Sequence, residues 1–153
     1  MALQNQKRMA TPKSKANVGM ALIILFVITL ATGVILHLKK HGILVEPRPL
    51  IKMVHWIAGF LMVGVACLHG IQFKKMLSAM QTKFRWFWAD TWIVIVFIVI
   101  TFISGLVKLL SPVKIPNLGL HHYWFGIIMS VAVVVHLVRG IPSWNRLRKI
   151  KKR

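Results

Sequence analysis

Two pairs of histidines with equal spacing carry the chemistry that this sequence offers. His55 and His69 lie in one apolar stretch, His122 and His136 lie in another, and the members of each pair are fourteen residues apart. Fourteen helical residues advance the chain by roughly 21 Å and fall only about 40° short of four full turns. We therefore expect the two imidazoles of a pair to face nearly the same way, with one near each surface of a membrane.

Imidazole nitrogens are common metal ligands, and this arrangement favours one kind of metal. Two layers roughly 21 Å apart cannot share a zinc ion, whose ligands lie within about 2.1 Å of it. Separate two-histidine sites are incomplete for zinc or copper without carboxylates or thiolates, and the chain has only two acidic residues and one cysteine. Haem iron needs only two axial ligands from the protein, and bis-histidine ligation favours electron transfer over oxygen chemistry. The pattern therefore predicts two layered haems.

The single cysteine indicates how such haems are attached. Cys67 stands in the sequence Ala66-Cys67-Leu68-His69, which lacks the C-x-x-C-H arrangement of covalent haem attachment. We therefore expect two non-covalent, b-type haems and no intrachain disulfide.

The elements that position the histidines are predicted to be membrane-spanning helices. The chain has 153 residues, 57% of them hydrophobic, and its only acids are Glu46 and Asp90, too few for the mixed-charge surface of a soluble domain. We predict an all-α membrane protein, a four-transmembrane-helix bundle over residues 18–142, between basic tails at 1–17 and 143–153. The apolar runs that approach the length needed to cross hydrocarbon are Val18–Leu38, Met53–Phe73, Thr91–Leu110 and Tyr123–Val138.

The net charge of +19 indicates membrane topology rather than nucleic-acid binding, because the basic residues gather at span ends and in the tails. Fifteen of the 21 Lys and Arg residues lie in the N-terminal tail, the 74–85 connection and the C-terminal end. By the positive-inside rule, both termini are predicted to be cytoplasmic. The basic tails are also expected to contact anionic membrane lipid.

An internal repeat predicts how the helices are arranged. Residues 28–33 (ITLATG) match residues 100–105 (ITFISG) at an offset of 72, whereas the histidines match at an offset of 67. The two halves are thus predicted to be tandem helical hairpins that differ by a five-residue loop deletion, so that the second and fourth helices run parallel. In both halves a glycine follows the first histidine by four residues, Gly59 in one and Gly126 in the other. These glycines leave room for a flat macrocycle between helices.

Parallel helices place corresponding histidines at the same depth. His55 is expected beside His122 near the outer surface, and His69 beside His136 near the inner surface. Any one histidine near a helix end is also explained by a hydrogen bond to water or headgroups. The shared spacing, the repeat and the trailing glycine together favour ligands.

Several other residues have alternative interpretations. His121 precedes His122 and would point about 100° away from the ligand direction, so the repeat favours His122 and leaves His121 as the alternative ligand. His37, near the outer end of the first span, is predicted to be interfacial, with a quinol-side proton relay as the alternative. We expect Asp90 to cap the third helix and Lys108 to snorkel to the headgroups, with a proton or quinone role as the alternative for Lys108. Packing is the predicted role of Met62 and Met129, with haem ligation as the alternative. The basic residues placed to meet haem propionates, or else to set topology, are Lys52, Lys74, Lys75 and Arg139.

These motifs resemble the di-haem core of the cytochrome b superfamily. They look still more like small four-helix bacterial cytochromes associated with flavinylated extracytoplasmic electron-transfer proteins. Those carry a span ending in Ser/Thr-Gly, a loop, and a His-aromatic-x-x-Gly span that ends at a second histidine. Here Thr32-Gly33 and Ser104-Gly105 precede residues 55–69 and 122–136. The resemblance covers about residues 18–142 and implies a multi-pass protein of the bacterial inner membrane. It assigns the outer haem iron to His55 and His122, and the inner haem iron to His69 and His136.

The resemblance also implies a function, transmembrane electron transfer that links the quinone pool or a redox partner on one side to an acceptor or donor on the other. Because these residues contain no flavin-binding or multihaem domain, we expect an electron-transfer subunit of an oxidoreductase system rather than an enzyme alone. Its partner would be a separate flavoprotein, iron-sulfur or multihaem subunit. The alternatives are a self-contained quinol oxidoreductase, a haem-free membrane anchor or assembly subunit, and a histidine-based ion carrier. The sequence predicts no direction of electron flow.

Overall fold

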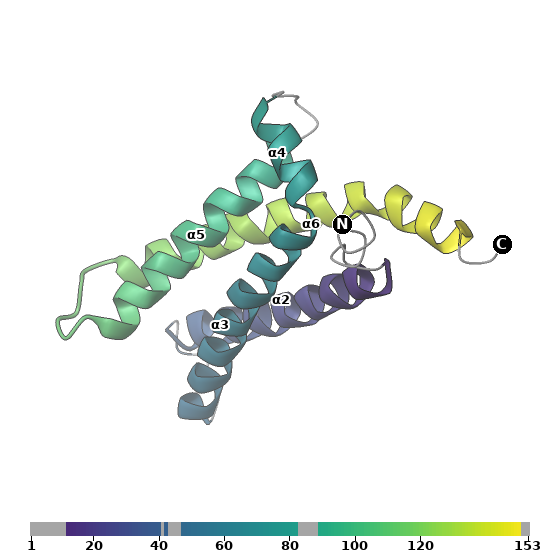
Figure 1. Cartoon of the computed structure of the whole chain (residues 1–153). Helices are drawn as coiled ribbons and strands as arrows, with labels where there is room; N and C mark the ends of the chain where they lie inside the picture. The colour runs from purple at the N-terminus through teal and green to yellow at the C-terminus, as the bar shows by residue number, and fades with distance from the viewer. Residues whose placement is uncertain (1–11, 41, 43–46, 83–88, 151–153) are drawn as a thin grey trace, which may run out of the picture. The chain divides into compact units, whose positions relative to one another are not determined.

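The apolar runs form long α-helices in a computed structural model of the chain (Figure 1). The structure describes residues 12–40, 42, 47–82 and 89–150. Within those residues it contains no β-strand, which confirms the predicted all-α class. The helices are α2 (Pro12–Lys40), α3 (Arg48–Gln72), α4 (Lys74–Thr82), α5 (Ala89–Leu110) and α6 (Leu118–Ile150).

Four of these helices are long and apolar enough to cross a membrane, which confirms the predicted fold class of a multi-pass membrane protein. Each candidate span begins two to five residues before a predicted run, and three of them cover the run, whereas Arg48–Gln72 ends one residue before the predicted Phe73. The helices start earlier because backbone hydrogen bonding extends into less apolar residues, and α3, for example, begins after Pro47 with a second proline in its first turn. The candidate spans are Ser14–Leu38, Arg48–Gln72, Ala89–Leu110 and Leu118–Gly140.

The predicted basic tails are helical where the structure describes them. α2 begins at Pro12, inside the predicted N-terminal tail of residues 1–17, and α6 continues to Ile150, inside the predicted C-terminal tail of residues 143–153. The rest of both tails lies outside the described residues. The division into two tails and one membrane domain stays a prediction.

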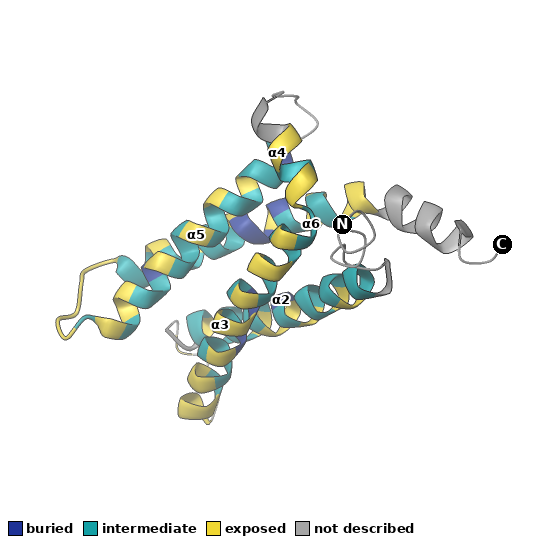
Figure 2. Cartoon of the chain, viewed as in Figure 1, coloured by how far each residue is buried: buried dark blue, intermediate teal, exposed yellow. Residues whose placement is uncertain are grey.

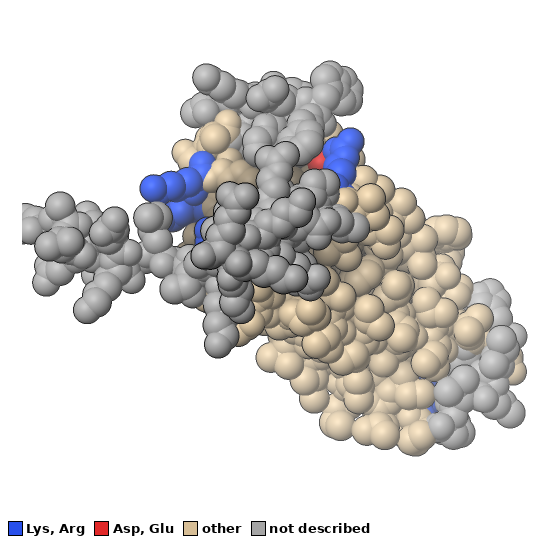
Figure 3. Space-filling view, turned by 90° about the vertical axis from the view of Figure 1, so that its right-hand side faces the viewer, with Lys and Arg blue, Asp and Glu red and all other residues tan. Residues whose placement is uncertain are grey.

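Most of the described surface is apolar. Figure 2 shows exposed and half-buried residues along every spanning helix, with few buried ones. Large hydrophobic side chains are exposed on all four spans, among them Ile24, Ile57, Val96 and Val131. In Figure 3 the Lys and Arg residues form small separate patches on a mostly uncharged surface. Such a surface would be costly in water and suits lipid tails, which are as apolar as leucine.

The chain divides into two compact units, each built around one helical hairpin. The first comprises residues 1–32 and 47–83, and the second comprises residues 33–46 and 84–153. The first unit therefore contains most of α2 with α3 and α4. The second contains α5 and α6 with the last turns of α2.

In the first unit, side-chain contacts near both ends join α2 to α3. Gln72 Nε2 donates a hydrogen bond to Ser14 Oγ at 3.1 Å, while Thr32 Oγ1 lies 3.0 Å from His55 Nδ1. The start of one helix thus meets the end of the other, so α2 and α3 run antiparallel as a hairpin.

The helix α4 departs from the predicted 74–85 connection, because residues 74–82 of that segment are helical. The chain turns at Phe73, whose N–H bonds to the carbonyls of His69 and Gly70 and whose carbonyl accepts from the N–H groups of Met76 and Leu77. Hydropathy cannot detect such a helix, because nine residues beginning with two lysines are too short and polar to register as a span.

In the second unit, α5 and α6 run side by side (Figure 1). The rings of Phe97 and Phe125 meet across this hairpin, with centroids 6.4 Å apart. α6 begins after Asn117, which adopts a positive φ of 59°, and the Asn117 carbonyl accepts hydrogen bonds from the N–H groups of Leu120 and His121. Asparagine tolerates this left-handed conformation better than most residues do.

The five-residue difference between the halves falls in the helix ends rather than in a shorter connection. α2 ends seven residues after Gly33, whereas α5 ends five residues after Gly105. α3 begins seven residues before His55, whereas α6 begins four residues before His122. Seven residues separate the two helices of each hairpin, 41–47 in one and 111–117 in the other. The predicted loop deletion is therefore wrong in its location.

Candidate functional site

The first histidine of α3 is fixed by two groups of α2. His55 Nδ1 lies 3.1 Å from the carbonyl oxygen of Thr29 and 3.0 Å from Thr32 Oγ1. A carbonyl oxygen only accepts hydrogen bonds, so Nδ1 carries the proton. The Thr32 hydroxyl donates its own hydrogen to the Ile28 carbonyl at 2.7 Å and is left to accept from the imidazole. In a neutral imidazole, the lone pair then lies on Nε2.

The first histidine of α6 is held in the same way. His122 Nδ1 lies 2.9 Å from Ser104 Oγ of α5, and the Ser104 hydroxyl donates to the Thr101 carbonyl at 2.9 Å. A serine hydroxyl has one hydrogen, so Ser104 accepts from the Nδ1–H of His122. His122 thus makes the same kind of Nδ1 contact as His55.

These two contacts are related by the internal repeat. Thr32 and Ser104 correspond at the offset of 72, while His55 and His122 correspond at the offset of 67. In the second unit the ring of His122 also lies against Gly105, where an added Cβ would stand 3.0 Å from Cε1 and 3.5 Å from Nδ1. Ser104 and Gly105 therefore supply both a hydrogen-bond acceptor and room for the ring of His122.

The second histidine of α6 has a charged partner. His136 Nδ1 lies 3.2 Å from Asp90 Oδ2, and Arg139 donates to Asp90 Oδ1 at 2.8 Å. Asp90 is buried, with 8% of its surface exposed. A carboxylate paired with a guanidinium accepts hydrogen bonds and donates none, so His136 donates from Nδ1, and in a neutral imidazole the lone pair then lies on Nε2. Thr91 Oγ1 lies 3.4 Å from the same nitrogen.

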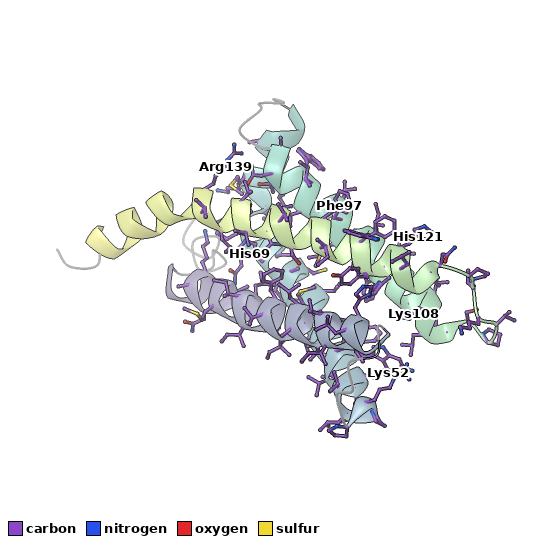
Figure 4. The ribbon with its side chains drawn as sticks, turned by 180° about the vertical axis from the view of Figure 1, so that it is seen from behind. Lys52, His69, Phe97, Lys108, His121 and Arg139 are labelled. Carbon is purple, nitrogen blue, oxygen red and sulfur yellow. The ribbon has the colours of Figure 1, made fainter. Side chains whose placement is uncertain are left out.

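Asp90 therefore plays a different role from the predicted helix cap. It is the second residue of α5, and its carboxylate reaches across to α6 instead of capping its own helix. Arg139, which the sequence placed to meet a haem propionate, is bound to this carboxylate. Figure 4 labels Arg139 on α6.

The second histidine of α3 lies in the last turn of its helix, where Figure 4 labels it. The ring of His69 packs against Phe73, with centroids 4.8 Å apart and planes inclined at 41°. Lys15 Nζ of α2 lies 5.0 Å from the centroid of the same Phe73 ring. An aromatic ring and a cationic side chain thus lie at this end of the hairpin.

No family model, no curated protein and no solved structure matches this chain. Its function is therefore argued from the side chains alone.

The alternative ligand His121 is placed differently from His122. Its side chain is exposed, and its ring lies 6.4 Å from that of Phe125, one turn further along α6 (Figure 4). His122, one residue later, contacts Ser104 of α5. His122 thus shares the kind of contact that His55 makes, and the choice of His122 over His121 as ligand stays a prediction.

Other predicted residues have contacts of their own. The ring of His37 stacks on that of Tyr123, with centroids 3.6 Å apart and planes within 6°, so this histidine is packed within the second unit. Lys52 Nζ lies 4.6 Å above the Trp56 ring. Met62 and Met129 correspond in the repeat and are both buried, which fits their predicted packing role.

The described residues fit a haem at two points. An added Cβ at Gly59 or Gly126 would meet no described atom within 4 Å, so no described side chain fills the turn after either first histidine, as is also the case at Gly19, Gly64 and Gly140. The same residues contain no group of three or more His, Cys, Asp or Glu that could hold a bare metal ion. Haem iron needs only two axial ligands from the protein, and imidazole nitrogens of these histidines can supply them.

The structure places one histidine of each predicted ligand pair in each unit. His55 and His69 belong to the first unit, and His122 and His136 belong to the second. The pairing of His55 with His122, and of His69 with His136, stays a prediction.

Sequence reasoning missed the partners of the histidines. Thr32 and Ser104 could be recognised in the sequence as equivalent residues of the Ser/Thr-Gly match. Their contacts with His55 and His122 could not be predicted, because the Ser/Thr-Gly match has an offset of 72 and the histidines have an offset of 67. The contact of Asp90 with His136 spans 46 residues and depends on the docking of α5 against α6. No local pattern predicts it.

Proposed function

We propose that this chain is a transmembrane electron conduit, a di-haem b-type cytochrome subunit of the bacterial inner membrane. The observation that carries the proposal is the contact that three histidines make through Nδ1. His55, His122 and His136 each donate from Nδ1 to a partner within their own hairpin, which in a neutral imidazole places the lone pair that would bind iron on Nε2. Ligand histidines are held in this way in metal sites, where the second nitrogen fixes the ring and its tautomer.

The proposed ligand sets follow the repeat. His55 and His122 would hold one haem iron, and His69 and His136 would hold the other. A bound haem would supply one-electron chemistry, with an iron whose axial positions are both filled by the protein. The chain's own contribution is to orient the imidazoles, to leave open the turns at Gly59 and Gly126, and to provide an apolar surround.

The proposed orientation rests on the distribution of positive charge. Both termini and the 74–85 segment would face the cytoplasm by the positive-inside rule. His55 and His122 would then lie near the outer surface, and His69 and His136 near the cytoplasmic surface. Electrons would pass between the quinone pool or a redox protein on one side and a flavoprotein, iron-sulfur or multihaem partner on the other.

Haem counting in single-histidine variants tests the ligand assignment. His69→Ala and His136→Ala should each lower the haem content of the purified full chain from two per protein to one. His121→Ala is the matched control and should retain two. If His121→Ala loses a haem while His122→Ala retains both, the choice between these neighbours is overturned. If none of the variants changes the content, the ligand assignment fails.

A further inference from the structure

The two ends of the α5/α6 hairpin present different hydrogen-bond acceptors to their histidines. At one end His122 donates to a neutral hydroxyl, Ser104 Oγ, at 2.9 Å. At the other end His136 donates to the carboxylate of Asp90 at 3.2 Å. In the first unit His55 also donates to neutral groups, a carbonyl and a hydroxyl. Of these three contacts, that of His136 is the one with an anionic acceptor.

The first hairpin has no carboxylate at the position that corresponds to Asp90 in the repeat. The residue that corresponds to Asp90 at the offset of 72 is Val18, and the residue that corresponds to Arg139 at the offset of 67 is Gln72. Gln72 donates to the neutral hydroxyl of Ser14 at 3.1 Å. The first unit thus has a neutral contact where the second has an ion pair.

Asp90 is also costly to keep in this position. It is one of two acidic residues in the chain, and its side chain is 9% exposed within an apolar helix pair. Burying a carboxylate is unfavourable unless it is paired and hydrogen-bonded. Arg139 supplies the countercharge at 2.8 Å, so the pair adds little net charge to its surroundings. What remains specific to Asp90 is the hydrogen bond that it accepts from His136.

A carboxylate acceptor changes the imidazole as a ligand. When Nδ1–H donates to an anion, electron density moves toward Nε2 and the ligand becomes more basic. A more basic axial ligand stabilises ferric iron over ferrous iron, and hydrogen bonding around the ligands is one of the factors that set haem potentials. A hydroxyl or a carbonyl acceptor has the same effect to a smaller extent, because hydrogen bonds to charged groups are stronger.

We propose that Asp90 is a positioning residue that lowers the reduction potential of the inner haem, held by His136, below that of the outer haem, held by His55 and His122. This rests on the proposed di-haem function and extends it to a direction. With the lower potential on the cytoplasmic side, electron transfer is downhill outward, from a cytoplasmic or quinol donor to an acceptor outside.

Optical redox titration of the purified full chain tests this proposal. The wild type should titrate in two components, and Asp90→Asn, which keeps the shape but removes the charge, should raise the lower component while the higher one stays in place. Asp90→Glu retains a carboxylate and should titrate closer to the wild type than Asp90→Asn does. Ser104→Ala is the matched control at the other end of the hairpin and should leave the lower component in place.

Single-haem variants assign the two components. His55→Ala should retain the inner haem, and in that background Asp90→Asn should raise the one remaining potential. His69→Ala should retain the outer haem, whose potential Asp90→Asn should not move. The proposal is overturned if Asp90→Asn shifts neither component, lowers one, or moves the higher one. A chain that binds no haem contradicts the proposed function itself. Two bound haems whose reduction potentials are the same in the wild type and in Asp90→Asn contradict only this inference.

Discussion

Each first histidine is held by groups that its own hairpin supplies. His55 and His122 both donate from Nδ1 to a hydroxyl whose single hydrogen is already bonded to a backbone carbonyl. This chain of bonds determines which nitrogen carries the proton and which way each ring faces. A ligand held in one orientation loses less conformational freedom when it binds iron, so these hydroxyls should contribute to haem affinity.

Removal of the serine hydroxyl should weaken haem binding. Ser104→Ala deletes the acceptor for the Nδ1–H of His122, and the loss of such a partner typically costs about 10- to 100-fold in metal affinity. Haem retention after dilution into apomyoglobin measures the effect. Ser104→Thr keeps the hydroxyl and should behave like the wild type. Equal retention in Ser104→Ala and Ser104→Thr would show that the hydroxyl does not orient the ligand.

The glycine beside the His122 ring should not tolerate a methyl group. In Gly105→Ala the added Cβ would lie 3.0 Å from His122 Cε1, so the ring or the helix must shift. We expect a destabilisation of about 1–3 kcal/mol, the usual range for an overfilled contact. At Gly19 an added Cβ meets no described atom within 4 Å, so Gly19→Ala should be neutral or stabilising by up to about 1 kcal/mol. Denaturant melts in detergent compare the two, and equal stabilities would contradict the contact.

The four histidines and the glycines that follow them could be predicted as site residues from the sequence, whereas the hydrogen-bond acceptors of the histidines could not. The spacing of the four histidines and the trailing glycines was readable because it follows helical geometry. The acceptor of His136 was not readable, because Asp90 has the position of an ordinary helix cap and only the docking of α5 on α6 turns it toward the histidine.

The α2/α3 and α5/α6 hairpins share the same internal repeat, but their helices begin and end at different positions relative to it. Hydropathy detects the four spans because a run of about 20 apolar residues is typical of membrane-crossing helices. It missed α4, whose nine residues lie directly after Phe73. Leu77 of α4 lies 3.7 Å from where a Cβ on Gly70 would stand. It also placed the five-residue difference in a loop, whereas helix ends lengthen or shorten without altering hydropathy.

The open turn in α6 provides a test at the level of the helix. An added Cβ at Gly126 meets no described atom within 4 Å, so Gly126→Leu should leave the helical content unchanged while filling the space proposed for the macrocycle. Far-ultraviolet circular dichroism should match the wild type, and the haem content should fall from two per chain toward one. Gly140→Leu, on the exposed end of the same span, should retain both haems. Full haem content in Gly126→Leu would contradict the proposed space.

The whole chain is a multi-pass membrane protein with a strongly asymmetric distribution of charge. Only positive charge decides the proposed orientation, since the two acidic residues are too few to offset it. The orientation in turn decides which histidines face the cytoplasm and therefore what the Asp90 ion pair means for the direction of electron flow.

Cysteine labelling tests this orientation directly. Cys67 is exposed, so it is first replaced by alanine, and single cysteines are then introduced as Val113→Cys in the 111–117 connection or Ser78→Cys in α4. In intact bacterial cells a membrane-impermeant maleimide should label position 113 and should reach position 78 only after lysis. Labelling of position 78 alone in intact cells would reverse the orientation.

The central claim is that the four histidines hold two non-covalent haems. The most direct measurement is the dithionite-reduced absorption spectrum of the purified full chain, with the haem counted as its pyridine complex against protein concentration. We predict b-type α and Soret bands, two haems per chain and complete extraction by acidified acetone. A helical, monodisperse protein that carries no haem after expression with ample haem supply would contradict the account.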